Sequence, residues 1–150
     1  MKYPNIIQAV FVDRPNRFLA HVKVDGRTET VHVKNTGRCR ELLLPGAEVW
    51  LTEPGTAGRK TKYDLVAVRK QSGILINIDS QAPNAVVREW LETQPYDVIR
   101  PEYSYGESRI DFYLEKKSER ILMEVKGCTL EIDGIGYFLC PCGNVFFMFN

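Results

Sequence analysis

The first half of the chain alternates apolar and polar residues in short runs that predict β-strands. Ile6 to Val12 is rich in apolar residues and ends at the turn sequence Asp-Arg-Pro-Asn, residues 13–16. Phe18 to Val24 alternates and stops at Asp25-Gly26, a dipeptide that strongly favours a hairpin turn. Thr28 to Val33 is therefore predicted to be the returning strand of a β-hairpin.

The same kind of pattern continues after a turn at Asn35-Thr36-Gly37. Arg38 to Leu44 predicts a short helix that Pro45-Gly46 closes, and Glu48 to Thr52 and Tyr63 to Arg69 predict two more strands. Five closely spaced strands in about 75 residues favour a small barrel or sandwich, because closure removes exposed strand edges. We prefer an OB-like barrel, so the expected fold class is α+β and β-rich.

The second half begins at a change of pattern over Ile74 to Asp79 and contains one predicted helix. Ala85 to Thr93 is amphipathic, and Pro95 follows it closely. Its apolar stripe consists of Val86, Val87, Trp90 and Leu91.

Two predicted strands follow the helix and carry polar residues on a common face. They run from Arg109 to Glu115 and from Arg120 to Lys126. If they form a hairpin that turns at Lys117-Ser118, alternation places Asp111 directly across from Glu124. Lys126 then lies on the same face. The apolar residues of both strands coincide on the opposite face.

Asp111, Glu124 and Lys126 would together supply the catalytic groups of a metal-dependent nuclease. Two carboxylates placed opposite each other destabilise a sheet, and an Mg²⁺ or Mn²⁺ ion between them removes that cost. The lysine would orient an attacking water or stabilise charge on a phosphate. Glu89 is our preferred further metal ligand, ahead of Glu92. The alternative is a solvated, charged strand face, because Asp followed by Glu-x-Lys matches many hairpins by chance.

Composition excludes several classes of protein. With 44% hydrophobic and 26% charged residues among 150, the chain is typical of a globular protein. The first residues lack the layout of a secretion signal, and no segment is long and apolar enough to span a bilayer. We therefore expect a cytoplasmic protein that does not enter a membrane. No nucleophile elbow or Gly-rich phosphate loop supports another hydrolase class.

The net charge of +1 conceals a separation of signs along the chain. Residues 1–70 hold 13 Lys and Arg against 7 Asp and Glu, whereas residues 71–150 hold 7 basic against 12 acidic residues. This asymmetry indicates one part that binds a polyanion and another that gathers carboxylates. Uneven surface charge without a function is the alternative.

The basic residues of the first half cluster around its predicted turns. We predict DNA contacts from Arg14, Arg17, Lys34, Arg38, Arg40, Arg59, Lys60 and Lys62, with Lys23 a further basic residue of the same half. Phe18, Tyr3 and Tyr63 lie close by in sequence, which suits phosphate contacts combined with base stacking. For Phe18 we prefer the alternative, a position in the core.

The histidines and cysteines offer weaker candidates. His21 and His32 have no carboxylate or cysteine at ligand spacing in the sequence and are predicted to be structural. The four cysteines are expected to be reduced thiols, and a zinc site is an alternative of little weight because Cys-x-Cys is not the common spacing. These cysteines are Cys39, Cys128, Cys140 and Cys142.

Five blocks of the sequence together resemble the sugar fermentation stimulation protein A family. They are RFLAHVKVDG (17–26), HVKNTGRCRELLLPGAEVWL (32–51), NIDSQAPNAVVREWL (77–91), YGESRIDFYLE (105–115) and MEVKGCTL (123–130). The resemblance implies an N-terminal OB-like domain and a C-terminal domain of the PD-(D/E)xK nuclease-like class. It also implies a DNA-binding role linked to the regulation of sugar (maltose) metabolism. Asp111, Glu124 and Lys126 match the nuclease signature of that class.

The end of the chain departs from the family pattern. Similar family members continue after Gly136-Tyr137-Phe138 with another layer of the nuclease core, whereas here an uncharged tail follows. This difference indicates a C-terminally truncated member, for example through a frameshift. The expected organisation is an OB-like domain over 1–76, a partial nuclease-like domain over 77–138 and an aberrant apolar tail over 139–150. The side chains of Ile110, Phe112, Met123 and Val125 would then lack packing partners.

The favoured function is therefore DNA binding linked to sugar metabolism, with DNA as the partner and the oligomeric state unassigned. One alternative is a DNA endonuclease that depends on Mg²⁺ or Mn²⁺. The other is a truncated fragment without activity.

Overall fold

The computed structural model divides the chain into two compact units. It describes residues 1–55, 58–140 and 143–148, and it describes side chains only as far as residue 137. The barrel unit comprises Lys2–Ser80 together with Thr129–Asn150, and the helix unit comprises Gln81–Cys128 together with Met1. Within the described residues, no helix has the length and apolar character needed to cross a membrane.

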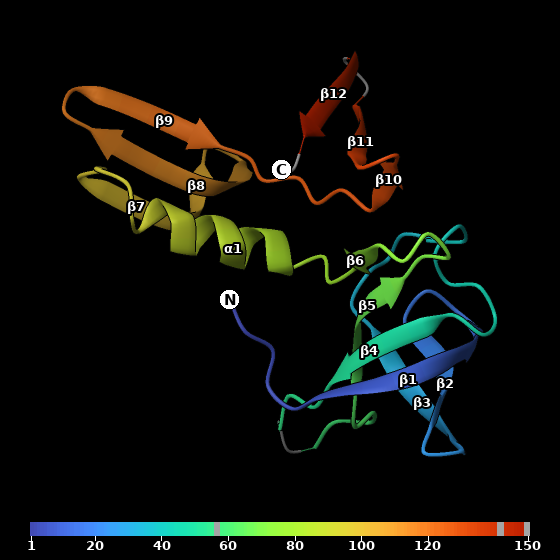
Figure 1. Ribbon diagram of the computed structural model, residues 1–150. Coiled ribbons are helices and arrows are strands. Elements are labelled where there is room, and N and C mark those ends of the chain that lie inside the picture. The colour runs from blue at the N-terminus through green and yellow to red at the C-terminus, as the bar shows by residue number, and fades with distance from the viewer. Residues whose placement is uncertain (56–57, 141–142, 149–150) are drawn as a thin grey trace. The chain divides into compact units, whose positions relative to one another are not determined.

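Six strands of the barrel unit form one curled, largely antiparallel sheet (Figure 1). They are β1 (Ile6–Asp13), β2 (Leu19–Val24), β3 (Arg27–Val33), β4 (Glu48–Thr52), β5 (Asp64–Arg69) and β6 (Leu75–Asn77), in the order β3-β2-β1-β4-β5-β6. A parallel pairing of His32 with Asp64 and of Val33 with Leu65 joins β3 to β5. Because this pairing is short, the sheet is OB-like without full closure. The predicted β-rich class with an OB-like first part is confirmed.

The hairpin of β2 and β3 turns at Asp25-Gly26, as its sequence predicts. Val24 pairs with Arg27 across a two-residue loop, and the loop residues have positive φ values of 49° and 80°. Two consecutive left-handed residues give a turn whose twist matches that of the flanking strands. The resulting register buries Ala20, Val22, Val31 and Val33 completely.

The segment predicted as a short helix, Arg38 to Leu44, forms turns instead. The backbone N–H groups of Leu42 and Leu43 both donate to the carbonyl of Cys39, at 3.1 and 2.9 Å. Cys39 has a φ of 44°, and a left-handed residue does not start a right-handed helix. Leu42 and Leu43 are nevertheless part of the barrel core. The prediction of a helix over Arg38 to Leu44 is therefore wrong.

A second small sheet belongs to the barrel unit. β10 (Leu130–Ile132), β11 (Ile135–Cys140) and β12 (Gly143–Met148) pair in this order. The ammonium group of Lys70 donates to the carbonyl of Glu131 at 2.7 Å and also to its carboxylate. The hydrogen bond from Lys70, aided by the N–H of Gly134, lowers the pKa of Glu131. Residues 139–150, predicted as an apolar tail, thus include strand backbone, while their side chains lie outside the described residues.

The helix unit is a three-stranded antiparallel sheet with one helix along it (Figure 1). Helix α1 (Ala82–Leu91) precedes β7 (Val98–Tyr105), β8 (Ser108–Lys116) and β9 (Glu119–Met123), which pair in chain order. Phe112 pairs with Met123 and Lys116 with Glu119, so the predicted hairpin register is confirmed. The buried core consists of Leu91, Phe112 and Leu114, and Ile121, Met123 and Val125 pack against it.

Helix α1 covers this core with only part of its predicted apolar stripe. Leu91 is fully buried and Val87 packs beside it, whereas Val86 and Trp90 are 53% and 51% exposed. Residues four apart share one face of a helix, so the Val87 and Leu91 face meets the sheet and the adjacent face does not. Because the helix covers the sheet, Phe112 is buried. The prediction that Phe112 lacks packing partners is wrong.

We expect Phe112→Ala to destabilise the protein strongly, because a core with so few buried side chains loses its largest fully buried one. The expected loss is about 3–5 kcal/mol of unfolding free energy. Leu122→Ala is the matched control, since Leu122 lies on the paired strand but is 44% exposed, and we expect it to cost less than about 1 kcal/mol. Urea unfolding followed by circular dichroism measures both, and equal losses would contradict the assigned core.

Candidate functional site

The ladder between β8 and β9 brings Asp111 and Glu124 together where its regular pairing ends. The last regular pair is Phe112 with Met123, so the next step sets Asp111 opposite Glu124. The N–H of Asp111 is 3.4 Å from Oε2 of Glu124. The ammonium group of Lys126 donates to Oε1 of Glu124 at 2.8 Å. Two carboxylates and one lysine therefore share one small surface, as the alternation predicts.

Asp111 is held by two donors that the sequence did not reveal. The N–H of Val125 donates to Oδ2 of Asp111 at 2.7 Å, and the side-chain amide of Asn84 donates to Oδ1 at 2.7 Å. Asn84 belongs to the first turn of α1, so the helix and the sheet are joined at this carboxylate. The sequence offered one signal for this contact: Asn84 is a polar residue at the start of a helix that packs on the sheet.

The structure does not bring Glu89 to this pair of carboxylates. Glu89 is exposed, and its carboxylate accepts a hydrogen bond from the amino group of Met1. The pairing of β7 with β8 places Glu102 opposite Asp111, and Glu102 forms an ion pair with Arg109. Across the described residues, no group of three or more His, Cys, Asp or Glu side chains is arranged to hold a metal ion. A ligand role for Glu89 stays a prediction, and no contact with Asp111 or Glu124 in the described residues supports it.

The atoms that Asp111 and Glu124 present suit a hard cation. Both offer only carboxylate oxygens, which Mg²⁺, Mn²⁺ and Ca²⁺ prefer, whereas zinc sites use mainly cysteine and histidine. Lys126 offsets one of the two negative charges, so a divalent ion would meet net attraction. Asp111 and Glu124 are the residues that would hold such an ion, with waters or phosphate oxygens completing its shell.

Arg14 binds four backbone carbonyls from two loops of the barrel unit. Its Nη1 donates to the carbonyls of Gly37 and Arg38 at 2.7 and 3.0 Å. Its Nη2 donates to the carbonyls of Arg17 and Asn35, both at 2.6 Å. Arg14 was predicted to contact DNA. Its two terminal nitrogens instead donate to these four carbonyls. It acts as a clamp between the loop before β2 and the loop after β3.

The clamped loops expose one aromatic ring and three guanidinium groups. Phe18 is 47% exposed, so its predicted core position is wrong, and the guanidinium of Arg17 lies 4.8 Å from the centre of its ring. Arg38 and Arg40 are exposed and have no side-chain ion pair within the described part of the chain. Since Arg14 binds the carbonyls of both Arg17 and Arg38, their side chains leave the backbone at neighbouring points.

Two other predicted DNA contacts neutralise buried acids. Lys34 donates to Asp79 at 2.7 Å, and the Asp79 side chain is completely buried. Arg59 donates to Asp64, which is also buried. A buried carboxylate without a cation partner is costly, so Lys34 and Arg59 stabilise the fold.

The remaining predicted DNA contacts lie on the loop before β5. They are Lys60 and Lys62, both exposed. Lys62 lies 3.7 Å from Glu53 and 4.8 Å from the ring centre of Tyr63. The carbonyl of Tyr63 accepts from the N–H of His32, and the carbonyl of Phe18 accepts from the next N–H of β3. The loops before β2 and β5 therefore border the same end of β3.

The histidines pair with carboxylates from other strands. His21 Nδ1 is 2.7 Å from Asp13 of β1, and His32 Nδ1 is 3.2 Å from Asp64 of β5. Spacing along the sequence missed both partners because they lie across the sheet.

The cysteines add no site within the described residues. Cys39 is buried, and desolvation raises the pKa of its thiol. Cys128 is half-buried, and neither cysteine forms a disulfide in the part of the chain that is described. The side chains of Cys140 and Cys142, which the zinc alternative requires, lie outside the described residues.

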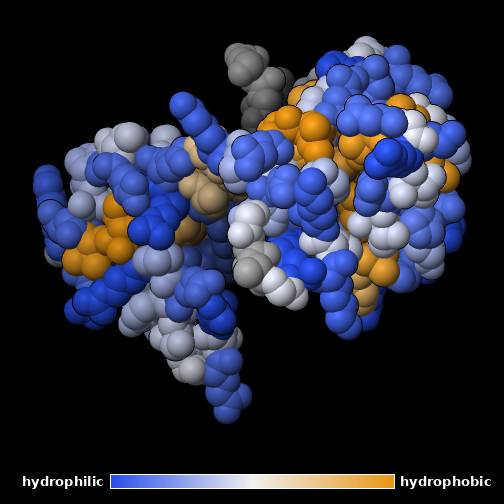
Figure 2. Space-filling model, turned by 90° about the horizontal axis from the view of Figure 1, so that it is seen from below, coloured by the Kyte–Doolittle hydropathy of each residue, from blue (hydrophilic) through white to orange (hydrophobic). Residues whose placement is uncertain are grey.

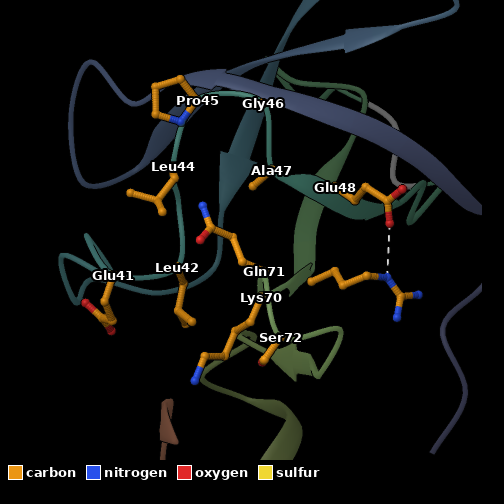
Figure 3. A pocket seen from close by; sticks show the side chains of 11 residues that line it. Glu41, Leu42, Leu44, Pro45, Gly46, Ala47, Glu48, Lys70, Gln71 and Ser72 are labelled. Carbon is orange, nitrogen blue, oxygen red and sulfur yellow. Dashed lines mark hydrogen bonds and ion pairs between the residues drawn. The ribbon is translucent and has the colours of Figure 1, made fainter. Parts of the chain in front are cut away.

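A pocket of about 530 Å³ lies on the barrel unit (Figure 3). One wall is apolar and consists of Leu42, Leu44, Pro45 and Ala47. On its rim Arg69 donates to Glu48 at 3.0 Å. Figure 2 shows one face of the molecule, on which hydrophilic residues predominate and hydrophobic residues gather in separate patches. None of the residues predicted to act in binding or catalysis lines this pocket.

Two family models match the chain, one over each part. The model described as SfsA N-terminal OB domain matches residues 12–78. The model described as Sugar fermentation stimulation protein RE domain matches residues 81–139.

Curated relatives and a solved structure are similar to the chain over most of its length. The sugar fermentation stimulation protein homolog of Desulfitobacterium hafniense (strain DSM 10664 / DCB-2) is 55% identical over 141 residues, which are 92% of this chain and 61% of the relative. That of Ruminiclostridium cellulolyticum is 49% identical over 142 residues, 92% of this chain and 62% of the relative. The chain thus spans about three-fifths of the length of these relatives. The structure of Pyrococcus furiosus SfsA in complex with Ca²⁺ has a TM-score of 0.73 and 28% identity, over 89% of this chain and 59% of that chain.

We expect Arg14→Lys to destabilise the barrel unit although it preserves the charge. An ammonium group has three donors and no planar fork, so it cannot make all four bonds, and each lost bond costs about 0.5–1.5 kcal/mol. Arg17→Lys is the control, because Arg17 is exposed on the same loop, and its effect should stay within about 0.5 kcal/mol. Thermal unfolding of both variants measures the difference. Equal stability of Arg14→Lys and the wild type would refute the clamp.

Proposed function

The chain belongs to the sugar fermentation stimulation protein family, and we propose that it binds DNA through the loops of its OB-like barrel. The family resemblance drawn from the sequence is confirmed by the two family models and by the relatives of about 50% identity. The chain spans about three-fifths of the length of those relatives. The activity and partners of the whole protein are therefore proposed for this chain. A part in the regulation of sugar metabolism belongs to it as well.

The observation that carries this proposal is the set of exposed cations on the two clamped loops. Arg17, Arg38 and Arg40 extend from backbone that a single guanidinium holds in place. Guanidinium groups without an acidic partner are available to DNA phosphates, and their binding releases condensed counterions.

Phe18 adds a second kind of contact to the same loops. Its ring is about half exposed and already stacks with the guanidinium of Arg17. An exposed ring beside cations offers a stacking platform for an unpaired base, as single-strand binders of the OB class use. Phosphate contacts and stacking together favour a nucleic acid over polyanions without bases.

We expect the double variant Arg38→Gln, Arg40→Gln to bind DNA at least about tenfold more weakly at low salt. Each lost phosphate contact reduces the magnitude of the slope of log affinity against log salt by about 0.7–0.9, so the double variant should reduce it by about 1.4–1.8. Fluorescence anisotropy of labelled DNA across a salt series, with EDTA present, measures both quantities.

The matched control for this experiment changes two cations at the opposite end of the same hairpin. Lys23 and Arg27 flank the Asp25-Gly26 turn and are exposed. Lys23→Gln with Arg27→Gln removes the same charge at a distance from the clamped loops. Equal losses in the two double variants would show that net charge alone determines binding, and unchanged binding by Arg38→Gln, Arg40→Gln would refute the interface.

Metal-assisted hydrolysis of a phosphodiester is a second candidate function, favoured by Asp111, Glu124 and Lys126. The similar protein from Pyrococcus furiosus was solved in complex with Ca²⁺, which supports a divalent cation here too. Such an ion, when bound, would polarise a phosphate oxygen and acidify a water. Asp111 and Glu124 would hold it. Lys126, hydrogen-bonded to Glu124, would place positive charge beside the phosphate.

We expect Asp111→Asn and Lys126→Ala each to abolish any divalent-metal-dependent cleavage while DNA binding persists. The first removes a charged metal ligand, and the second removes the cation next to the phosphate. Arg120→Ala is the control, because Arg120 is an exposed basic residue of the same sheet. Gel assays of supercoiled and single-stranded DNA with Mg²⁺, Mn²⁺ or EDTA measure cleavage. Absence of cleavage with either metal, in this chain and in the longer Desulfitobacterium relative, would refute this second function.

A further inference from the structure

We propose that Asn84 is the third protein oxygen donor of the divalent-cation site at Asp111 and Glu124. Its amide donates a hydrogen bond to Asp111 when no cation is bound and turns its oxygen towards the cation when one binds. This inference rests on the metal site of the second proposed function. It replaces Glu89 as the residue through which helix α1 serves that site.

The position of Asn84 is fixed by the backbone around it. Asn84 lies in the first turn of α1 directly after Pro83, whose ring restricts the backbone there. The chain that leaves β9 passes close to this turn, because a Cβ added to Gly127 would lie 3.0 Å from Cγ of Pro83. The helix start and the segment after Lys126 are therefore in contact. Asn84 is half-buried at this junction.

The hydrogen bonds of Asp111 show which partner a cation can replace. The N–H of Val125 is a backbone donor at 2.7 Å from Oδ2, and it can move only with the main chain. Asn84 Nδ2, at 2.7 Å from Oδ1, belongs to a side chain that rotates. Each carboxylate oxygen has two lone pairs, so Asp111 can keep the bond from Val125 and still bind a cation.

The amide of Asn84 can act as donor or ligand without a change of charge. A carboxylate only accepts, so the amide must present its NH₂ group to Asp111 in the structure described. Rotation about its last torsion exchanges the nitrogen and oxygen, and such terminal torsions have broad, roughly two-fold wells. The amide oxygen has no hydrogen-bond partner among the described residues. Side-chain carbonyls are common ligands of Ca²⁺.

Glu89 lacks this geometry although it lies on the same helix. It is exposed and bound to the amino group of Met1, and it shares no hydrogen bond with Asp111 or Glu124. The described residues contain no cluster of three acidic, histidine or cysteine side chains that could hold a metal ion, so a third protein ligand beside Asp111 and Glu124 must be of another type. The third oxygen comes from an amide.

The test measures Ca²⁺ binding directly, without reference to cleavage. Isothermal titration calorimetry with CaCl₂ should show binding to the wild type that Asn84→Leu weakens by about tenfold or more, since the hydrophobic residue offers no oxygen. Asn84→Asp should bind Ca²⁺ more tightly than the wild type, because affinity rises with ligand charge. Glu89→Gln should bind like the wild type. A loss in Glu89→Gln with none in Asn84→Leu would overturn the assignment.

Thermal unfolding separates a ligand from a residue that only supports the fold. Without a cation, Asn84→Asp sets two carboxylates side by side and should lower Tm. Ca²⁺ should then raise its Tm by more than it raises that of the wild type, because tighter binding gives a larger shift. If Asn84 only supports the fold, Ca²⁺ will raise the Tm of Asn84→Asp no more than that of the wild type, and the proposal fails.

Asp111→Asn distinguishes failure of this inference from failure of the metal site. If the wild type does not bind Ca²⁺, or if Asp111→Asn binds as well as the wild type, the metal site itself is refuted and Asn84 with it. If Asp111→Asn abolishes binding while both Asn84 variants bind like the wild type, the metal site stands and only the role of Asn84 is overturned.

Discussion

The guanidinium of Arg14 is the interaction on which the candidate DNA interface depends. Carbonyl groups of loops have no ladder partner and are satisfied by side chains or by water. Four such carbonyls, from residues 17, 35, 37 and 38, are satisfied by this one side chain. A rigid, planar fork of donors suits this task, and an ammonium group does not. Two irregular segments thereby acquire defined positions without any strand pairing between them.

The same requirement operates at the end of the β8 and β9 ladder. Regular pairing stops after Phe112 and Met123, so the N–H of Val125 lacks its ladder partner. The carboxylate of Asp111 accepts that N–H and thereby replaces the missing backbone carbonyl. A residue proposed for metal binding is thus also a structural cap. This double role fixes its carboxylate in place, a geometric requirement for any metal ligand on a sheet.

The sequence predicted the Asp111 and Glu124 pair because strands have a period of two. The turn at Lys117-Ser118 and the alternation of apolar residues leave one register that buries Phe112, and that register decides which polar residues meet. The contact of Asn84 with Asp111 and the bonds of Arg14 to loop carbonyls escaped prediction for a different reason. Asp111, the partner of Asn84, and three of the four carbonyls that Arg14 binds lie more than twenty residues away in sequence. No local periodicity describes such contacts between distant segments.

Total charge proved a poor guide to which cations bind a ligand. The first 70 residues hold 13 basic side chains, yet Lys34 and Arg59 neutralise buried acids and Arg14 satisfies carbonyls. Desolvation makes the partners of the buried acids obligatory, since a buried carboxylate without a cation costs more than an exposed ion pair contributes. A cation becomes available to DNA when no buried group requires it. Arg38 and Arg40 meet that condition because the loop that carries them is held by Arg14 and not by their own side chains.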